Sequence, residues 1–299
     1  MTWLTGPAVV TVPATSANLG PGFDSLGLAL ELRDALRGSV VARGLTVTVE
    51  GEGADAVPLD ESHLVVRAMR EAFARLGDAP PGLELVCTNR IPHARGLGSS
   101  SAAIVGGVHL ARALVTGGSE RMSDLEAFRL AARLEGHPDN VAAACFGGLT
   151  VSGGEGDGCF AARAEVASSI RAVVLVPPTA LSTEVSRGLL PDVVPHAEAA
   201  ANAGRAALLM AALAGQPALL LTATEDLLHQ SYRRPAMPDS LDLVEALRAA
   251  GHAAVVSGAG PTVLVLTAAE TADVLVFAPA GWDARVLDVA STGVAARVG

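Results

Sequence analysis

One segment constrains the fold of this chain more than any other: the glycine- and serine-rich run Pro92–Ser101, with the sequence PHARGLGSSS. It lies between a predicted strand at Leu83–Cys87 and a predicted helix at Ala102–Leu114. Gly96 and Gly98 have no Cβ, so a ligand can approach the backbone closely there. The free N–H groups that open the following helix favour an anion such as phosphate. An ordinary strand–helix turn with a serine cap has a similar sequence, and that alternative stays open.

Composition narrows the possible classes of protein. A length of 299 residues suits one large domain or two that share a cleft. The net charge of −10 argues against binding to nucleic acid. All 21 basic residues are arginine, which excludes a Walker lysine or a Schiff-base lysine. The apolar stretches are too short to span a bilayer and no signal peptide is evident, so we expect a cytoplasmic protein that does not bind membranes.

The three cysteines, Cys87, Cys145 and Cys159, are scattered without the spacing of a metal site or a disulfide framework. We expect them to fill the core of a protein in a reducing compartment.

The periodicity of apolar residues indicates an α+β fold. Strands are expected at Ala8–Pro13, Leu45–Glu50, Leu83–Cys87, Leu149–Val151, Ala172–Val176, Ala253–Val256 and Val263–Leu266. Helices are expected at 64–76, 102–114, 124–134, from Pro138 to Gly147, and at 183–189, 197–214 and 240–250. The glycine-rich link Gly153–Gly158 is the predicted boundary between two domains, 1–155 and 156–299.

Three other groups of polar residues are candidates for a site. The loop from Asn18 to Asp24 suits either a self-satisfied turn or a binding site. The segment Glu135–Asn140 suits either a helix cap or an active site. Arg187 and Arg233 could be ordinary solvated arginines or a fork for a carboxylate. Chemistry alone does not choose between these alternatives.

Four motifs together resemble the GHMP kinases, a family of small-molecule kinases. The run PHARGLGSSSA at Pro92–Ala102 resembles the phosphate motif of that family, and SGAGPT at Ser257–Thr262 its C-terminal glycine motif. The segments VPATSANLGPGFD at Val12–Asp24 and EGHPDN at Glu135–Asn140, the latter followed by FGG, are similar to the homoserine-specific branch of the family. The four matches follow the family's order along nearly the whole chain.

The resemblance implies a two-domain fold. Its N-terminal α/β domain would contain an unusual left-handed βαβ crossover, and its C-terminal domain would be ferredoxin-like. The active site would lie between the two domains, and the protein would be a homodimer. The implied reaction is transfer of the γ-phosphate of ATP to the side-chain hydroxyl of L-homoserine, a step of threonine biosynthesis.

The resemblance also implies roles for individual residues. Residues of the ATP loop are Pro92, Gly96, Leu97, Gly98, Ser99, Ser100 and Ser101. Ser100 and Glu135 are the expected ligands of Mg²⁺. Residues at the amino acid substrate are Asn18, Asp24, His137, Asp139, Arg187, Arg233 and Gly260. Asp139 and Asn140 join Ser100 and Glu135 in the catalytic set, Asp139 first as a positioning group and second as a base. Arg234 could exchange roles with Arg233, which we prefer.

Two other functions remain open. A relative acting on mevalonate or a sugar is disfavoured, since mevalonate kinases use a lysine near the acceptor hydroxyl and this chain has none. A catalytically silent ligand sensor on the same fold is disfavoured because Ser100, Glu135 and Asp139 are all present.

Overall fold

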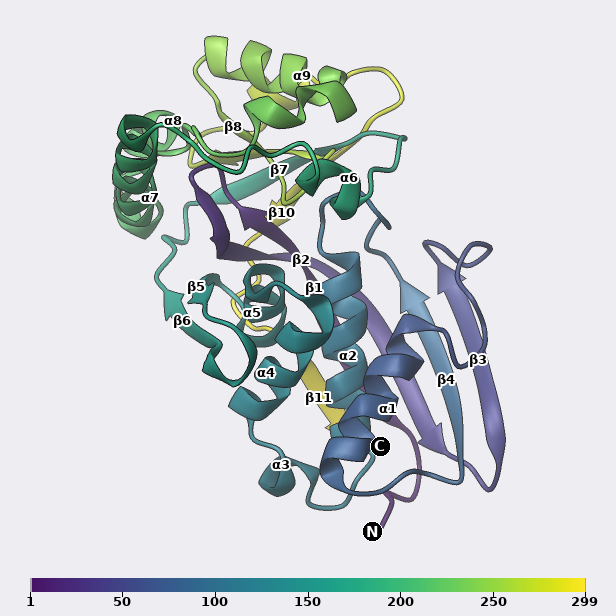
Figure 1. Cartoon of the computed structure of the whole chain (residues 1–299). Coiled ribbons are helices and arrows are strands. Elements are labelled where there is room, and N and C mark those ends of the chain that lie inside the picture. The colour runs from purple at the N-terminus through teal and green to yellow at the C-terminus, as the bar shows by residue number, and fades with distance from the viewer. Residues whose placement is uncertain (1, 299) are drawn as a thin grey trace.

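The computed structural model describes residues 2–298 and contains two β-sheets with helices packed against them (Figure 1). The larger sheet has seven strands, in the order β11-β1-β2-β4-β3, with β5 paired to β2 and β6 paired to β5. Its strands are β1 (Ala8–Asn18), β2 (Gly22–Val40), β3 (Gly44–Gly51), β4 (Gly82–Asn89), β5 (Leu149–Gly153), β6 (Phe160–Ala164) and β11 (Ala295–Val298).

A βαβ unit forms one side of this sheet. Strands β3 and β4 are parallel neighbours, in register from Gly44 opposite Gly82 to Gly51 opposite Asn89. Helix α1 (Leu64–Leu76) connects them. The 3.6-residue period of its apolar side chains predicts one buried face, and Met69 and Phe73 are indeed fully covered there. Gly77 ends the helix with a φ of 93°, as expected for a glycine stop.

Four longer helices lie together on one face of the large sheet (Figure 1): α1, α2 (Ser99–Ala113), α4 (Asp124–Glu135) and α5 (Pro138–Phe146). The short α3 (Gly118–Arg121) connects α2 to α4. A capping box fixes the start of α4, because Ser123 and Glu126 satisfy each other's backbone N–H groups. This start sets the position of Glu135 at the other end of the helix, beside the phosphate loop.

The second sheet belongs to the C-terminal half and confirms the ferredoxin-like prediction. Its strands are β7 (Arg171–Val176), β8 (Ala253–Val256), β9 (Val263–Thr267) and β10 (Asp283–Asp288). They lie in the order β10-β7-β9-β8, and every neighbouring pair is antiparallel. The helices of this half are α6 (Thr183–Arg187), α7 (His196–Gly215), α8 (Leu220–Ala223), α9 (Pro238–Ala249) and α10 (Ala272–Leu275). Short 3₁₀ helices lie at Gly156–Gly158, Pro217–Leu219 and Ser231–Ala236.

Strand β7 shows how the two halves share a core. Its side chains alternate between two hydrophobic clusters, as the two-residue period of a strand requires. Ala172, Val174 and Val176 face the main cluster, which extends into the N-terminal half. Val173 and Leu175 face a second cluster that includes side chains of α9. Because both faces are buried, the strand is a continuous apolar run without alternating polar residues.

Among the departures of the fold from the sequence predictions are strand β2, the start of α2 and the proposed domain boundary. The 19-residue strand β2 was not predicted, since its pattern is irregular, and it pairs with β1, β4 and β5. Helix α2 begins at Ser99 rather than at Ala102. The boundary predicted at residue 155 falls in the turn between β5 and β6, which pair with each other, and β11 returns to the first sheet. The two-domain division stays a proposal.

Two predictions about composition can be compared with the structure. Cys87, Cys145 and Cys159 are buried free thiols, as expected of residues that fill the core. Among residues 2–298, no helix is both long enough and apolar enough to cross a bilayer.

Candidate active site

Residues from both halves of the chain meet in one small pocket of about 90 Å³. The predicted site residues that line it are Asn18, Gly96, Gly98, Ser99, Ser100, Ser101, Glu135, His137, Asp139, Asn140, Arg187, Arg233 and Gly260. Asp24 is not among the lining residues, but it accepts a hydrogen bond from Arg187, which lines the pocket. Pro92 and Leu97 are buried, so their side chains belong to the core and only their backbone can serve a ligand.

The phosphate loop ends in a helix start that no side chain caps. Gly98 is the N-cap residue of α2, with φ 70° and ψ 27°, and the first helical bond runs from Ala102 N–H to its carbonyl. The N–H groups of the first turn therefore remain available to a ligand. Since the positive end of the helix dipole lies there too, the loop provides an anion site made largely of backbone.

Close packing, more than flexibility, explains the two glycines of the loop. A Cβ on Gly98 would lie 1.9 Å from Thr15 Oγ1, and one on Gly96 would lie 2.3 Å from the carbonyl oxygen of Ser257. Ser257 in turn donates from its hydroxyl to the Gly96 carbonyl at 2.6 Å. The C-terminal glycine motif thus holds the phosphate loop from behind, across 161 residues of sequence.

Glu135 connects the loop to the end of α4. Its Oε1 accepts hydrogen bonds from Ser100 Oγ at 2.6 Å and from Ser101 Oγ at 2.9 Å. Burial raises the pKa of Glu135, and the two hydroxyls partly oppose that rise. The carboxylate and the Ser100 hydroxyl are hard oxygen donors that converge on one point, as a magnesium site needs. The described residues contain no cluster of three or more acidic, His or Cys side chains that could hold a metal unaided.

Asp139 lies in the first turn of α5, where Pro138 starts the helix. Its carboxylate is buried and accepts the Asn140 N–H at 2.6 Å. Burial raises the pKa of Asp139 to about 6, because the desolvation of the charge outweighs that hydrogen bond. The side chain of Asn140 accepts a bond from Thr15 Oγ1 at 2.8 Å, and so is fixed on β1.

His137 immediately precedes α5 as its N-cap residue, although its side chain makes no capping bond. Burial and the neighbouring Arg187 lower the pKa of its imidazole, so it lines the pocket as a neutral group near pH 7.

Asn18 is the last residue of β1 and Asp24 the third residue of β2, and both have positive φ angles, 70° and 54°. Asn18 donates to the Gly258 carbonyl at 2.8 Å and accepts the Asp24 N–H at 3.0 Å. Asp24 accepts two bonds from Arg187, at 2.5 and 3.1 Å. The two groups predicted to bind opposite ends of an amino acid are therefore paired with each other in this structure.

Arg233 and Arg234 have different environments. Arg233 is 1% exposed, lines the pocket and donates to the Gly258 carbonyl at 3.0 Å. Burial and the nearby Arg187 lower the pKa of Arg233 to about 10, which leaves it charged at neutral pH. Arg234 instead forms exposed ion pairs with Asp242 and Glu245 of α9. This difference supports the preference for Arg233, whose role stays a prediction.

Comparison with known proteins places this geometry in a family. The model of the GHMP kinase N-terminal domain matches residues 63–148, and that of the GHMP kinase C-terminal domain matches residues 197–278. Homoserine kinase of Streptomyces avermitilis is 56% identical over 285 residues, which cover 95% of this chain and 93% of that protein. This chain belongs to the GHMP kinase family.

Two further likenesses agree with that assignment. Homoserine kinase of Streptomyces coelicolor is 56% identical over 95% of this GHMP kinase and 92% of its own length. The crystal structure of homoserine kinase from Cytophaga hutchinsonii superposes with a TM-score of 0.86 at 25% identity, covering 99% of each chain.

Some residues that build this GHMP kinase site were missed by sequence reasoning. Three of them do not line the pocket but bond to residues that do: Thr15, Ser257 and His229. A fourth, Phe23, lies under both pocket arginines, with its ring centroid 5.5 Å from each guanidinium carbon. Thr15 and Ser257 lie inside the motifs Val12–Asp24 and Ser257–Thr262, which could have indicated that they belong to the site. Their contacts are remote in sequence: Thr15 bonds to Asn140, 125 residues away, and Ser257 to Gly96, 161 residues away.

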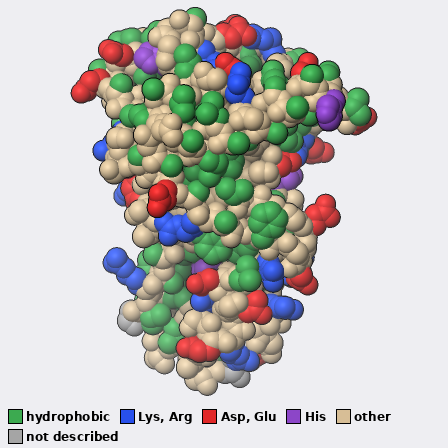
Figure 2. All heavy atoms as spheres, turned by 90° about the vertical axis from the view of Figure 1, so that its left-hand side faces the viewer, with side chains coloured by type: hydrophobic (Ala, Val, Ile, Leu, Met, Phe, Trp, Pro, Cys, Tyr) green, Lys and Arg blue, Asp and Glu red, His purple; other side chains and the backbone are tan. Residues whose placement is uncertain are grey.

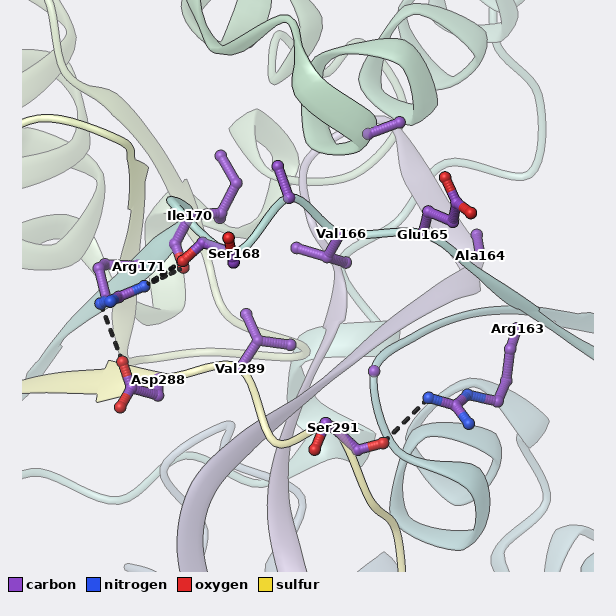
Figure 3. Close-up of a pocket in the computed structure, with 13 residues that line it drawn as sticks. Arg163, Ala164, Glu165, Val166, Ser168, Ile170, Arg171, Asp288, Val289 and Ser291 are labelled. Carbon is purple, nitrogen blue, oxygen red and sulfur yellow. Dashed lines mark hydrogen bonds and ion pairs between the residues drawn. The ribbon is translucent and has the colours of Figure 1, made fainter.

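A cavity larger than this pocket lies elsewhere in this GHMP kinase, with a volume of about 830 Å³ (Figure 3). It contains none of the predicted site residues. Arg171 and Asp288 form an ion pair at 2.9 Å on one side of it, and Arg163 donates to the Ser291 carbonyl at 2.9 Å on the other. Cavity size alone would therefore point away from the motif residues.

Proposed function

We propose that this GHMP kinase transfers the γ-phosphate of ATP to the side-chain hydroxyl of L-homoserine, producing O-phospho-L-homoserine. One observation carries the proposal: a backbone anion site and a cluster of opposite charges meet at one buried carboxylate. The anion site is the start of α2, the charged cluster contains Asp24, Arg187 and Arg233, and the carboxylate is Asp139.

The nucleotide would occupy two adjoining regions. Its phosphates would bind the first-turn amides of α2, where the N-terminal dipole favours negative charge. A second cavity, of about 260 Å³, shares Ser99 and Ser100 with this loop and is lined by apolar side chains that include Val57, Pro58 and Leu64. Such a cavity suits the flat apolar faces of a purine base.

The Ser100 and Glu135 oxygens fit a role as magnesium ligands. When bound, Mg²⁺ neutralises charge on the β- and γ-phosphates. Few protein oxygens suffice, because this ion takes most of its ligands from phosphates and water. Glu135 orients the Ser100 hydroxyl by accepting its hydrogen bond at 2.6 Å, and burial raises the pKa of this carboxyl.

The charged cluster fits a zwitterionic amino acid. Arg187 and Arg233 are two guanidinium groups beside one Phe23 ring, and a substrate carboxylate between them would reduce their mutual repulsion. Asp24 retains free lone pairs for the substrate ammonium, and Asn18 fixes its backbone. With these two ends held, the hydroxyl of homoserine would point towards the phosphate loop.

Asp139 would orient that hydroxyl and, secondarily, take its proton. A carboxyl group with a pKa of about 6 is mostly ionised at pH 7 and is a stronger base than an ordinary aspartate. Asn140 keeps the carboxylate in place through its backbone N–H, and is itself held by Thr15. Positioning and electrostatic stabilisation would supply most of the rate enhancement, as in other phosphoryl transfers.

One assay separates this proposal from its alternatives: ADP release measured with ATP and Mg²⁺ in the presence of homoserine, mevalonate, galactose or no acceptor. Release that depends on homoserine supports the proposal. Release that depends on mevalonate or galactose would assign another acceptor, and nucleotide binding without any turnover would indicate the ligand sensor. Omission of Mg²⁺ tests the role of the metal in the same experiment.

We also propose that the enzyme is a homodimer in the cytoplasm. The family resemblance supports the dimer, as does the exposed apolar Phe160 on the outer strand β6, which is 54% exposed (Figure 2 shows the apolar side chains on that side of the molecule). The three free thiols support a reducing compartment. Sedimentation equilibrium tests the assembly, and a monomer at micromolar concentration would contradict it.

A further inference from the structure

Arg233 is held by a contact that restricts the chemistry of its neighbour. Its Nη1 lies 3.1 Å from Nδ1 of His229, and also donates to the Gly258 carbonyl at 3.0 Å. A guanidinium group carries only donors and stays charged near neutral pH. The contact is therefore a hydrogen bond only if His229 Nδ1 carries no proton.

The other nitrogen of His229 faces acceptors. Nε2 lies 2.8 Å from the carbonyl oxygen of Gly20 and 3.5 Å from Asp226 Oδ1. Both neighbours can only accept, so Nε2 must carry the proton. The two ends of the ring thus require one form of His229, the neutral imidazole with its proton on Nε2. An imidazolium would direct an N–H at the guanidinium of Arg233, and burial and Arg233 both lower the pKa of His229 against the opposing effect of Asp226.

The surroundings of His229 fix the position of the ring. Asp226 accepts the backbone N–H groups of Leu228, His229 and Gln230 at 2.7 to 3.1 Å, which shapes the turn that carries the histidine. Phe23 stacks on the imidazole with centroids 5.0 Å apart and planes inclined by 23°. The His229 side chain is fully buried and does not line the pocket, so it cannot contact a bound substrate directly.

We propose that His229 is a positioning residue for the acceptor substrate: through Nδ1 it holds the Arg233 guanidinium towards the substrate carboxylate, while Gly20 and Asp226 fix its tautomer. The inference rests on the proposed function, because it needs an acceptor with a carboxylate. It adds a function for a side chain outside the pocket. It also links the two loops of the acceptor site, since Gly20 lies between Asn18 and Asp24.

The test compares three variants by steady-state kinetics with ATP and homoserine. His229→Phe keeps the stacking surface and removes both hydrogen bonds, and we expect the homoserine KM to rise about 10- to 100-fold, because a small misplacement of a binding group has effects of that size. The change in kcat and in the ATP KM should stay within about 3-fold. His229→Asn returns an acceptor to the position of Nδ1 and should recover part of the homoserine KM.

Gln230→Leu is the matched control on the same turn. Gln230 Oε1 accepts the N–H of Val256, a contact that supports the fold and does not involve Arg233. We expect this variant to unfold at a lower urea concentration while its homoserine KM stays within about 2-fold of wild type. A rise in KM as large as that of His229→Phe would show that any damage to the turn has this effect, and would overturn the proposal.

A double-mutant cycle keeps the inference testable if His229→Phe does not fold. In an Arg233→Met background, His229→Asn should add no further increase in homoserine KM, because the group through which it acts is gone. Fully additive effects would overturn the proposal. Failure of the proposed function is seen separately, as wild-type enzyme that releases no ADP in response to homoserine.

Discussion

The two sides of the pocket are built from different materials. The phosphate side consists of backbone: Gly96 and Gly98 approach neighbouring atoms too closely for any Cβ, and the α2 amides carry no side-chain cap. The acceptor side consists of charged side chains, with Asp24 and Arg187 paired to each other at 2.5 Å. One side is fixed by packing and the other by ion pairs.

This difference predicts how substitutions on each side of the pocket affect stability and activity. A backbone site tolerates no added atom, because the loop has no room to relax. A site made of paired charges must exchange an internal ion pair for contacts with its ligand. Here that pair is Asp24 and Arg187, whose side chains are about one-third exposed to solvent. Its own contribution to stability is therefore small. Substitutions on the phosphate side should damage folding and turnover together, whereas those on the acceptor side should change affinity with little loss of stability.

The largest effect is expected for Gly98→Ala. The new Cβ would meet Thr15 Oγ1, and the φ of 70° is strained for alanine. We expect kcat/KM for ATP to fall by roughly 10³-fold or more and the free energy of unfolding to fall by about 2–4 kcal/mol. Gly44→Ala is the control, since its φ of 81° is similar but no atom lies within 4 Å. Equal behaviour of the two variants in urea unfolding and kinetics would contradict the packing argument.

Glu135→Gln should have the next largest effect. It keeps the shape of the side chain and removes the charge that converges with Ser100 on the proposed magnesium site. We expect kcat to fall about 10²- to 10³-fold while the homoserine KM changes little. Titration of activity with Mg²⁺ should show weaker binding of the metal by the variant. The control is Glu165→Gln, at an exposed position away from the pocket, and its titration should match wild type. A normal Mg²⁺ titration for Glu135→Gln would remove the residue from the metal site.

Asp139→Asn should lower activity and raise stability. We expect kcat to fall about 10²-fold. The pKa of Asp139 rises from 3.8 to about 6 in the folded protein, so its ionised form costs folding free energy. That cost is fully present above pH 6 and absent below pH 4, where the carboxyl is protonated in both states. The variant should therefore gain about 1–3 kcal/mol at pH 8, and the gain should vanish towards pH 4.

Urea unfolding at several pH values measures this gain. The same pKa predicts that wild-type kcat declines as the pH falls through about 6, because the base becomes protonated. A stability advantage that is independent of pH would show that Asp139 is not the group responsible.

Arg187→Met should give the smallest of the four effects. Removal of one guanidinium from the acceptor side should raise the homoserine KM about 10- to 30-fold, with kcat and stability nearly unchanged. Arg234→Met serves as the control, because Arg234 pairs with α9 at the surface. If Arg187→Met binds homoserine normally, the proposed carboxylate contact is wrong.

Local sequence predicted much of the fold. The apolar period located α1 and α7 to within a residue or two at each end, and the glycine at position 77 marked the end of α1. Strand β2 was missed because its 19 residues bulge where they pair with Pro13–Ala14 and Ala17–Asn18 and change partners along their length. No single period therefore runs through it.

The candidate site was predictable as a set of residues but not as a set of contacts. The motifs indicated Ser100, Glu135, Asp139 and Arg233, all of which reach one pocket. Sequence did not show that Asp24 and Arg187 are paired with each other, or that His229 lies behind Arg233. Asp24 and Arg187 are 163 residues apart and approach one another only when the chain folds. His229 and Arg233 are only four residues apart, but the tautomer of the histidine depends on the remote Gly20 carbonyl.

The sequence by itself determined the local chemistry: a glycine loop before a helix, a carboxylate in the first turn of another helix, and a chain without lysine. Such features depend on neighbours within a few residues, so they can be read in order along the chain. Only the tertiary structure decided which charges face each other and which carboxylate loses its water. Desolvation and ion pairing depend on distances between remote segments, and the packing of the fold sets those distances.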